Sequence, residues 1–311
     1  MKKKMTITIA ILLIIAAGVF GVKYLNKDTD KSSDNVITIA HKYGETKVNK
    51  NPSNIAVFDY GALDSLEVLG IEASGLPKQS IPSSLSKYKD DKYKDLGGLK
   101  EPDFEKLSAL KPDLIIISGR QANLYDEFSK IAPTLYVEID NNDQITSIIK
   151  NLRMYADIFD KKDVAEKEIE DIEKSIEELK LKAIATEKNG LIALANSNSF
   201  SVYGKGSRFG IIHQSFGIPA VDSNIEDSTH GQKASFEYIV EKDPDYLFVI
   251  DRAAVAGGDV SADKLFENEL MKKTKAYQNN NIVYLNAENW YTVMGGVTSL
   301  KSMITEINNC L

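Results

Sequence analysis

The sequence predicts an α/β protein made of two similar lobes that a long helix joins. The chain has 311 residues, of which 43% are hydrophobic and 27% charged, as expected for about two globular domains. The segment FEKLSALKPDLIIISGR at 104–120 recurs as FEYIVEKDPDYLFVIDR at 236–252 with Phe, Glu, Pro, Asp and Arg at matching places, which indicates an internal repeat. Between the copies, residues 145–159 and 164–185 lack Gly and Pro, and the second segment is rich in Glu and Lys, a pattern typical of helices.

The N-terminus predicts export. Three lysines at 2–4 precede the uncharged residues 5–22, which is the pattern of a signal peptide or of an N-terminal membrane anchor. Lysines before the apolar run favour a cytoplasmic N-terminus, so the rest of the chain is expected outside. Ala16-Ala17-Gly18 offers small residues but no A-x-A triplet, so cleavage and retention at 1–22 both stay open. The only cysteine is Cys310, so none follows the apolar run to carry a lipid.

The polar residues 23–35 predict a flexible tether, and 36–160 predict an N-terminal α/β lobe. Two short runs of apolar or β-branched residues, Val36–Ala40 and Asn54–Phe58, indicate strands. A helix is expected after the second strand, because apolar residues then recur at helical spacing, at Leu63, Leu66, Leu69 and Ile71.

Each repeat copy predicts a short helix, a Pro-Asp turn that ends it, a buried strand, and an arginine just after the strand. These arginines are Arg120 and Arg252. Ligands of open α/β sheets bind beyond the carboxyl ends of the strands, so both arginines would meet a ligand in a cleft between the lobes. Between the copies, 161–186 predicts the joining helix, and 187–311 predicts the C-terminal lobe. The helix has a narrow apolar stripe of Ile169, Ile172, Ile176 and Leu179.

Three loops of the C-terminal lobe carry further candidate residues. Arg208 lies in a glycine-rich turn after a strand, His230 in a polar loop before the second repeat copy, and Tyr291 after the strand 282–285. Ferric iron prefers anionic oxygen ligands such as a tyrosine phenolate, and an unprotonated imidazole is an acceptable second ligand. Such a site is complete only if a chelator supplies the remaining donor atoms. Arginines suit that chelator because guanidinium groups bind flat anionic oxygen ligands.

Several other functions are disfavoured. The net charge of −7 leaves no basic footprint for nucleic acid. The order Gly-Lys-Gly-Ser at 204–207 is not that of a phosphate-binding loop, so we expect no nucleotide site. A hydrolase would need Ser207 or Ser228 beside His230 and an acid such as Asp227. No G-x-S-x-G motif occurs, so we expect no catalytic residues and no enzyme.

From residue 36 onward the sequence resembles the siderophore-binding subunits of bacterial iron importers of the ATP-binding-cassette class. Within that family it is similar to the group that takes ferric catecholates of the petrobactin and enterobactin types. The resemblance rests on Asn51-Pro52 with VFDYGALD at 57–64, on PDFE at 102–105 with KPDL at 111–114, and on the ordered set Arg120, Arg208, His230, Arg252 and Tyr291.

The resemblance implies the class III periplasmic-binding-protein fold, in which one long helix joins two Rossmann-like lobes with little hinge motion. It implies that three arginines, Arg120, Arg208 and Arg252, bind the catecholate oxygens. It also implies that His230 and Tyr291 coordinate Fe(III) when the chelator is only tetradentate.

The resemblance further implies that Glu105 and Glu237, one on each lobe, dock on the permease subunits. The ferric catecholate siderophore would be the transported ligand, with no intrinsic cofactor. The protein would be a monomer outside the cytoplasm, either anchored by its N-terminal segment or free in the periplasm. Two alternatives stay open: haem or cobalamin binding on the same fold, with His230 or Tyr291 as an axial ligand, and a membrane-anchored sensor or adhesion module.

Overall fold

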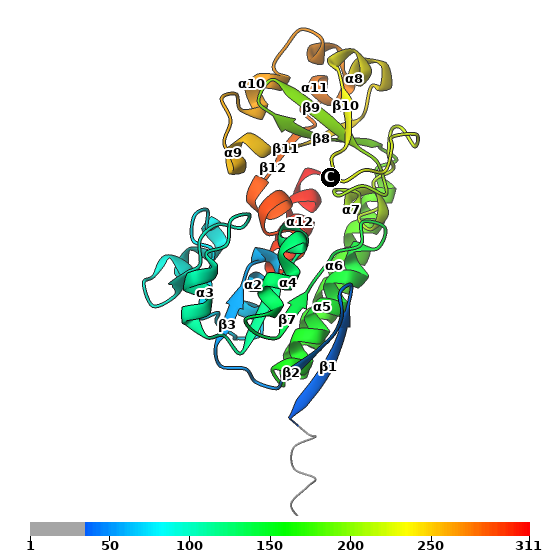
Figure 1. Ribbon diagram of the computed structural model, residues 1–311. Coiled ribbons are helices and arrows are strands. Elements are labelled where there is room, and N and C mark those ends of the chain that lie inside the picture. Colours follow the sequence, from blue (N-terminus) through cyan, green and yellow to red (C-terminus); the bar gives the residue numbers. More distant parts are fainter. Residues whose placement is uncertain (1–34) are drawn as a thin grey trace, which may run out of the picture.

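The computed structural model describes residues 35–311, which form two lobes, one above the other in Figure 1. The predicted export segment and nearly all of the predicted tether lie outside the described residues. Within the described part, no helix is both long and apolar enough to span a membrane. Each lobe contains a five-stranded sheet, so the two-lobed α/β fold that the repeat predicts is confirmed.

The N-terminal lobe has a parallel sheet in the order β5-β4-β3-β6-β7. Its central strands are fully buried, as expected for a parallel sheet with both faces covered. The strands are β3 (Ile55–Val57), β4 (Gly75–Leu76), β5 (Lys94–Asp95), β6 (Leu114–Ile117) and β7 (Thr134–Tyr136). The helical elements are α2 (Tyr60–Val68), η1 (Ser83–Lys89), α3 (Phe104–Leu110), η2 (Gly119–Leu124), α4 (Tyr125–Ser129) and α5 (Gln144–Ile158). An antiparallel hairpin of β1 (Val36–His41) and β2 (Gly44–Asn49) lies beside this sheet. The strands predicted at Val36–Ala40 and Asn54–Phe58 are observed as β1 and β3.

Helix α2 ends earlier than the apolar spacing predicts. The extension to Ile71 is wrong, because the helix ends at Val68 and Leu69 caps it. Gly70 then adopts a φ of 75°, a left-handed conformation that favours glycine, and the Ile71 N–H donates to the Leu66 carbonyl at 2.9 Å. Ile71 still packs against the core from this turn, which explains why it fits the apolar pattern.

The C-terminal lobe has a mixed sheet in the order β10-β9-β8-β11-β12. Strands β8, β10, β11 and β12 run in one direction and β9 runs in the opposite direction, a feature that the sequence pattern did not indicate. The strands are β8 (Gly190–Asn196), β9 (Ser199–Tyr203), β10 (Gln232–Ala234), β11 (Tyr246–Asp251) and β12 (Ile282–Leu285). The helical elements are α7 (Ile211–Gln214), α8 (Phe236–Lys242), α9 (Arg252–Ala256), α10 (Ala262–Phe266), η3 (Met271–Lys273), α11 (Lys275–Gln278), η4 (Glu288–Thr292) and α12 (Val297–Cys310).

The two repeat copies have the same local structure, α3 followed by β6 and α8 followed by β11. The acid of each Pro-Asp turn makes an equivalent contact. The Asp113 carboxylate accepts the N–H of Asn54 just before β3, and the Asp245 carboxylate accepts the N–H of Asn189 just before β8. Each acid therefore joins the repeat strand to the start of the neighbouring strand in its sheet.

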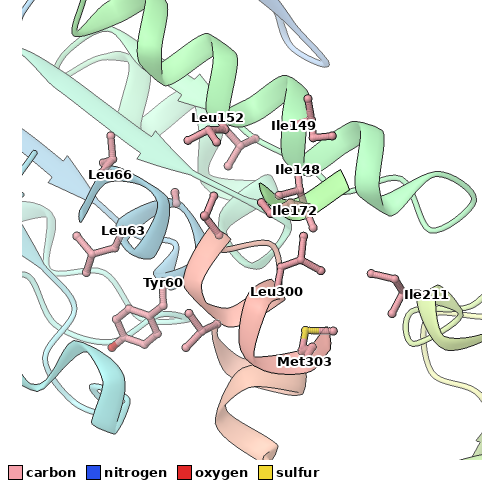
Figure 2. Close-up of a cluster of buried hydrophobic side chains, with 14 of the residues drawn as sticks. Tyr60, Leu63, Leu66, Ile148, Ile149, Leu152, Ile172, Ile211, Leu300 and Met303 are labelled. Atoms are coloured by element: carbon pink, nitrogen blue, oxygen red, sulfur yellow. The ribbon is translucent and has the colours of Figure 1, made fainter. Parts of the chain in front are cut away.

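Helices α6 and α12 connect the two lobes. The predicted joining helix is α6 (Lys162–Ala185), which runs from one lobe to the other in Figure 1 and buries Ile169, Ile172 and Leu179 of the predicted stripe. Helix α12 returns from the C-terminal lobe and packs against α2 and α6. Figure 2 shows Leu300 and Met303 of α12 in one cluster with buried side chains of α2 and α5. The end of the chain thus contributes to the core beneath the cleft.

Candidate functional site

A cleft of about 510 Å³ lies between the lobes. From the N-terminal lobe it is lined by residues that directly follow β3 and β6, among them Asp59 and Arg120. Loops of the C-terminal lobe contribute Arg208, His230 and Tyr291. The cleft is thus at the carboxyl ends of parallel strands, where α/β sheets bind ligands.

Arg120 reaches across the cleft from the N-terminal lobe. It lies in η2, which begins after β6 with a capping box between Ser118 and Gln121. Its Nη2 donates to the backbone carbonyl of Tyr291 at 3.0 Å, and its Nη1 lies 3.8 Å from the Asp59 carboxylate. Arg120 therefore connects the two walls of the cleft.

Arg208 donates to the same carbonyl from the C-terminal lobe. Its Nη2 lies 2.7 Å from the Tyr291 carbonyl oxygen, and its guanidinium carbon lies 4.3 Å from the centre of the Tyr291 ring. Burial and the positive charge of Arg120 lower the pKa of the Arg208 guanidinium. Two like charges held together in this way favour the entry of an anion.

Arg252 completes the group from the first position of α9, just after β11. Its Nε donates to the Tyr291 hydroxyl at 3.2 Å, and its Nη1 donates to the Asn196 side-chain carbonyl at 2.8 Å. All three predicted arginines therefore converge on one tyrosine, although they lie far apart in the sequence.

Tyr291 lies in a π-helical turn, η4, in which the Val293 N–H donates to the Glu288 carbonyl at 2.8 Å. The adjacent Trp290 is fully buried, and its indole N–H donates to Glu306 at 2.7 Å. Burial would raise the pKa of the Tyr291 phenol. The hydrogen bond from Arg252 and the charges of the three arginines outweigh burial and lower that pKa below its usual value of 10. The phenolate, which is the form that binds a hard metal ion, is thereby favoured.

His230 is an exposed residue of the loop before β10 and lines the same cleft. Its backbone N–H donates to the Ser228 hydroxyl at 3.1 Å. Within residues 35–311, no group of three or more His, Cys, Asp or Glu side chains could hold a metal ion. His230 and Tyr291 could thus supply only part of an iron coordination sphere, with a chelator supplying the rest.

Ser207, one of the two serines that the hydrolase alternative could use, has another role. Ser207 is fully buried, and its hydroxyl bonds to backbone groups of Gly204, Glu226 and Ser228. A hydroxyl engaged in this way is a structural group rather than a nucleophile paired with an imidazole.

Comparison with known proteins identifies the family. The family model of periplasmic binding proteins matches residues 55–288. The chain belongs to this family. This chain is 42% identical to the petrobactin-binding protein YclQ of Bacillus subtilis, over 100% of this chain and 99% of YclQ. It is 34% identical to the ferric-anguibactin-binding protein FatB of Vibrio anguillarum, over 87% of this chain and 86% of FatB.

Solved structures agree with this assignment. The crystal structure of YclQ matches 88% of this chain and 98% of its own with a TM-score of 0.87 and 46% identity. The catecholate-siderophore-binding protein VctP of Vibrio cholerae matches 88% of this chain and 99% of its own with a TM-score of 0.84 and 33% identity. These relatives are substrate-binding proteins rather than enzymes, and their fold is the two-lobed class III fold that the resemblance implied.

In this protein, Glu105 and Glu237 lie outside the cleft. Each is an exposed residue in the first turn of the repeat helix of its lobe, α3 or α8. Neither forms an ion pair with any residue of the described chain. Both carboxylates are therefore accessible to a partner, one on each lobe.

Two residues of this protein, Asp59 and Asn196, support the arginines of the site but were not predicted from the sequence. Asp59 caps α2 through the Ala62 N–H and also accepts the Ser118 hydroxyl at 2.7 Å beside Arg120. Asn196, at the end of β8, holds Arg252. Asp59 follows a buried strand and Asn196 ends one. The rule that ligands bind beyond the carboxyl ends of strands, which identified the arginines, could therefore also have identified these two residues.

Proposed function

We propose that this protein is the substrate-binding protein of a bacterial iron importer of the ATP-binding-cassette class, and that it captures an iron(III)–catecholate complex between its lobes. The observation that carries the proposal is the convergence of three guanidinium groups on Tyr291 in the cleft. The proposal is supported by relatives that are named for binding petrobactin, ferric anguibactin and catecholate siderophores.

The arginines would recognise the negative charge of the complex. Arg120 and Arg208 now donate to an uncharged backbone carbonyl. A catecholate oxygen is a stronger acceptor than this carbonyl, because its negative charge attracts the positively charged guanidinium groups. An entering catecholate would therefore replace the carbonyl as their partner. A neutral hydroxamate complex would leave the guanidinium groups poorly paired, which disfavours its binding.

Tyr291 and His230 would complete the iron coordination of a tetradentate complex. The lowered pKa of Tyr291 eases the loss of its proton on binding iron. The exposed position of His230 at the cleft leaves its imidazole accessible to the ligand. A hexadentate complex already fills the coordination sphere and would use only the arginines.

The protein would work outside the cytoplasm as a monomer and deliver its ligand to a permease. Its relatives include periplasmic proteins and lipoproteins. Retention at the membrane would depend on the N-terminal segment, since no cysteine lies directly after it to carry a lipid. Glu105 and Glu237 would contact the permease, one from each lobe.

The proposal is tested by titrating the protein with ferric bis-catecholate and ferric hydroxamate complexes while recording fluorescence. Trp290 is the only tryptophan and lies next to Tyr291, so a bound ferric complex should quench its emission. We expect the anionic bis-catecholate complex to bind at least about tenfold more tightly, because several charge-assisted hydrogen bonds depend on its charge. Tighter binding of the hydroxamate complex would refute the proposal.

A further inference from the structure

We infer that Ser207 and Asp227 are positioning residues that hold the loop of His230 onto the loop of Arg208, so that the placement of the imidazole in the cleft depends on them. The Arg208 loop comprises residues 204–210, and the His230 loop comprises residues 225–231. The inference rests on the proposed function, because it assigns these residues to the iron-binding part of that site.

The buried Ser207 hydroxyl links the two loops. Its Oγ accepts the Gly204 N–H at 3.1 Å within its own loop and the Ser228 N–H at 3.4 Å from the other loop. It also donates to the Glu226 carbonyl at 3.5 Å. One donated and two accepted bonds use the full capacity of a hydroxyl. Ser228 in turn accepts the His230 N–H, so a continuous path runs from Ser207 to the backbone of His230.

Asp227 provides a second link between the loops. Its Oδ1 accepts the Gly206 N–H at 2.7 Å. The contact requires glycine, because a Cβ on Gly206 would lie 2.2 Å from Asp227 Oδ2. At the other end of the loop, Gly231 has a φ of 71°, and a Cβ there would lie 2.7 Å from the Tyr203 ring. The His230 loop is therefore held closely at both ends.

The Arg208 loop has an independent attachment to the opposite lobe. Gln144, the first residue of α5 and 1% exposed, donates to the Arg208 carbonyl at 3.0 Å and to the Ser207 carbonyl at 3.4 Å. Arg208 also keeps its own bond to the Tyr291 carbonyl. Loss of the Asp227 contact removes one of the two links and should therefore loosen the His230 loop while leaving Arg208 in place. The contribution of His230 to iron binding can then be measured separately from the contribution of Arg208 to anion binding.

The test compares a tetradentate ferric bis-catecholate with a hexadentate ferric tris-catecholate, both titrated by fluorescence quenching. Asp227→Ala should weaken the tetradentate complex about tenfold, as the loss of one metal-ligand contact would, and the hexadentate complex less than about threefold. Asp227→Asn keeps an oxygen acceptor and should bind both complexes like the wild type. The double variant Asp227→Ala/His230→Ala should bind no more weakly than His230→Ala, because both changes remove the same contact.

Ser207→Ala should have the same effect as Asp227→Ala, weakening the tetradentate complex more than the hexadentate complex. The exposed Asp227 keeps the test valid if the buried serine variant fails to fold. Ser199→Ala, whose exposed hydroxyl contacts only the Asn196 carbonyl, is the matched control and should bind normally. Equal losses for both complexes in Asp227→Ala, or a loss that adds to that of His230→Ala, would overturn the inference. The proposed function fails in a different way, by the wild type binding neither ferric complex.

Discussion

Asp64 is a buried acid that connects α2 to the start of α12. It is 2% exposed, and its Oδ2 accepts the N–H groups of Thr298 at 2.7 Å and Ser299 at 3.3 Å. Gly296, the N-cap of α12, has no side chain to bind these groups, so an acid from the other end of the chain does so. A Cβ on Gly296 would lie 2.3 Å from that carboxylate, which explains the glycine.

The ionisation of Asp64 should make folding stability depend on pH. Burial raises the pKa of its carboxyl from 3.8 to about 6, and the two backbone N–H groups only partly oppose this. Between these values the folded protein binds more protons than the unfolded chain, so the free energy of unfolding falls as pH rises. Relative to Asp64→Asn, the wild type should lose up to about 3 kcal/mol between pH 4 and pH 7. Urea denaturation of both proteins across this range measures the difference.

Asp222→Asn is the matched control for this measurement. Hydrogen bonds from the Asn224 N–H and from Lys242 lower the pKa of Asp222, so its charge stabilises the fold above the unfolded pKa. This contribution is lost as pH falls, which is the opposite sign to Asp64. A difference between the wild type and Asp64→Asn that stays constant with pH would contradict the assignment.

At the scale of elements, η4 is fixed to both lobes and carries Tyr291 between them. Trp290 attaches it to α12 through Glu306, and the Asn289 carbonyl accepts the Ser299 hydroxyl at 2.9 Å. On the other side, both oxygens of Glu288 accept the Ser83 N–H of η1, at 2.9 and 3.0 Å, and the Ser83 hydroxyl donates to the same carboxylate. The Glu288–Ser83 contact thus holds the turn of Tyr291 against the N-terminal lobe.

Removing the Glu288 contact should loosen η1. Glu288→Ala deletes the acceptors of two hydrogen-bond donors, so local opening of η1 should become roughly tenfold more frequent. Amide hydrogen exchange of residues 83–89 measures this, and exchange in α6 should not change. Glu267→Ala, an exposed acid of the same lobe, is the control. Unchanged exchange in η1 of the Glu288 variant would show that the contact does not restrain the lobes.

Local sequence determined which elements were predictable. The strands that precede Arg120 and Arg252 and the helix α6 follow from apolar runs and periodicity. Each arginine follows the carboxyl end of a strand in its own lobe, which is where α/β sheets bind ligands. The π-turn of Tyr291 depends on Trp290 and on an acid in another helix, and local pattern does not report such contacts. The same reason hides Asp64, whose partners lie 234 and 235 residues further along the chain.

At the scale of the whole molecule, the net charge of −7 does not describe the site. Arg120 and Arg208 line the cleft and Arg252 bonds to Tyr291 in its wall, whereas many of the acids, including those of the repeat helices, lie on the solvated surface. A group of arginines at the cleft of a protein with negative net charge makes the potential there locally more positive and favours capture of an anionic ligand. The outer acids are then available for a different partner, and the repeat places equivalent acids on the two lobes.

Uptake in cells should therefore depend on Glu105 and Glu237 although ligand binding does not. The two acids occupy equivalent first-turn positions of α3 and α8, outside the cleft, so replacing both should leave the affinity for the ferric complex within about twofold. Loss of charge pairs with a permease would instead reduce transport of radioactive iron about tenfold or more. Glu127→Ala/Glu267→Ala removes one exposed acid from each lobe away from the repeat and should transport normally. Normal transport by the Glu105→Ala/Glu237→Ala variant would show that the permease recognises another surface.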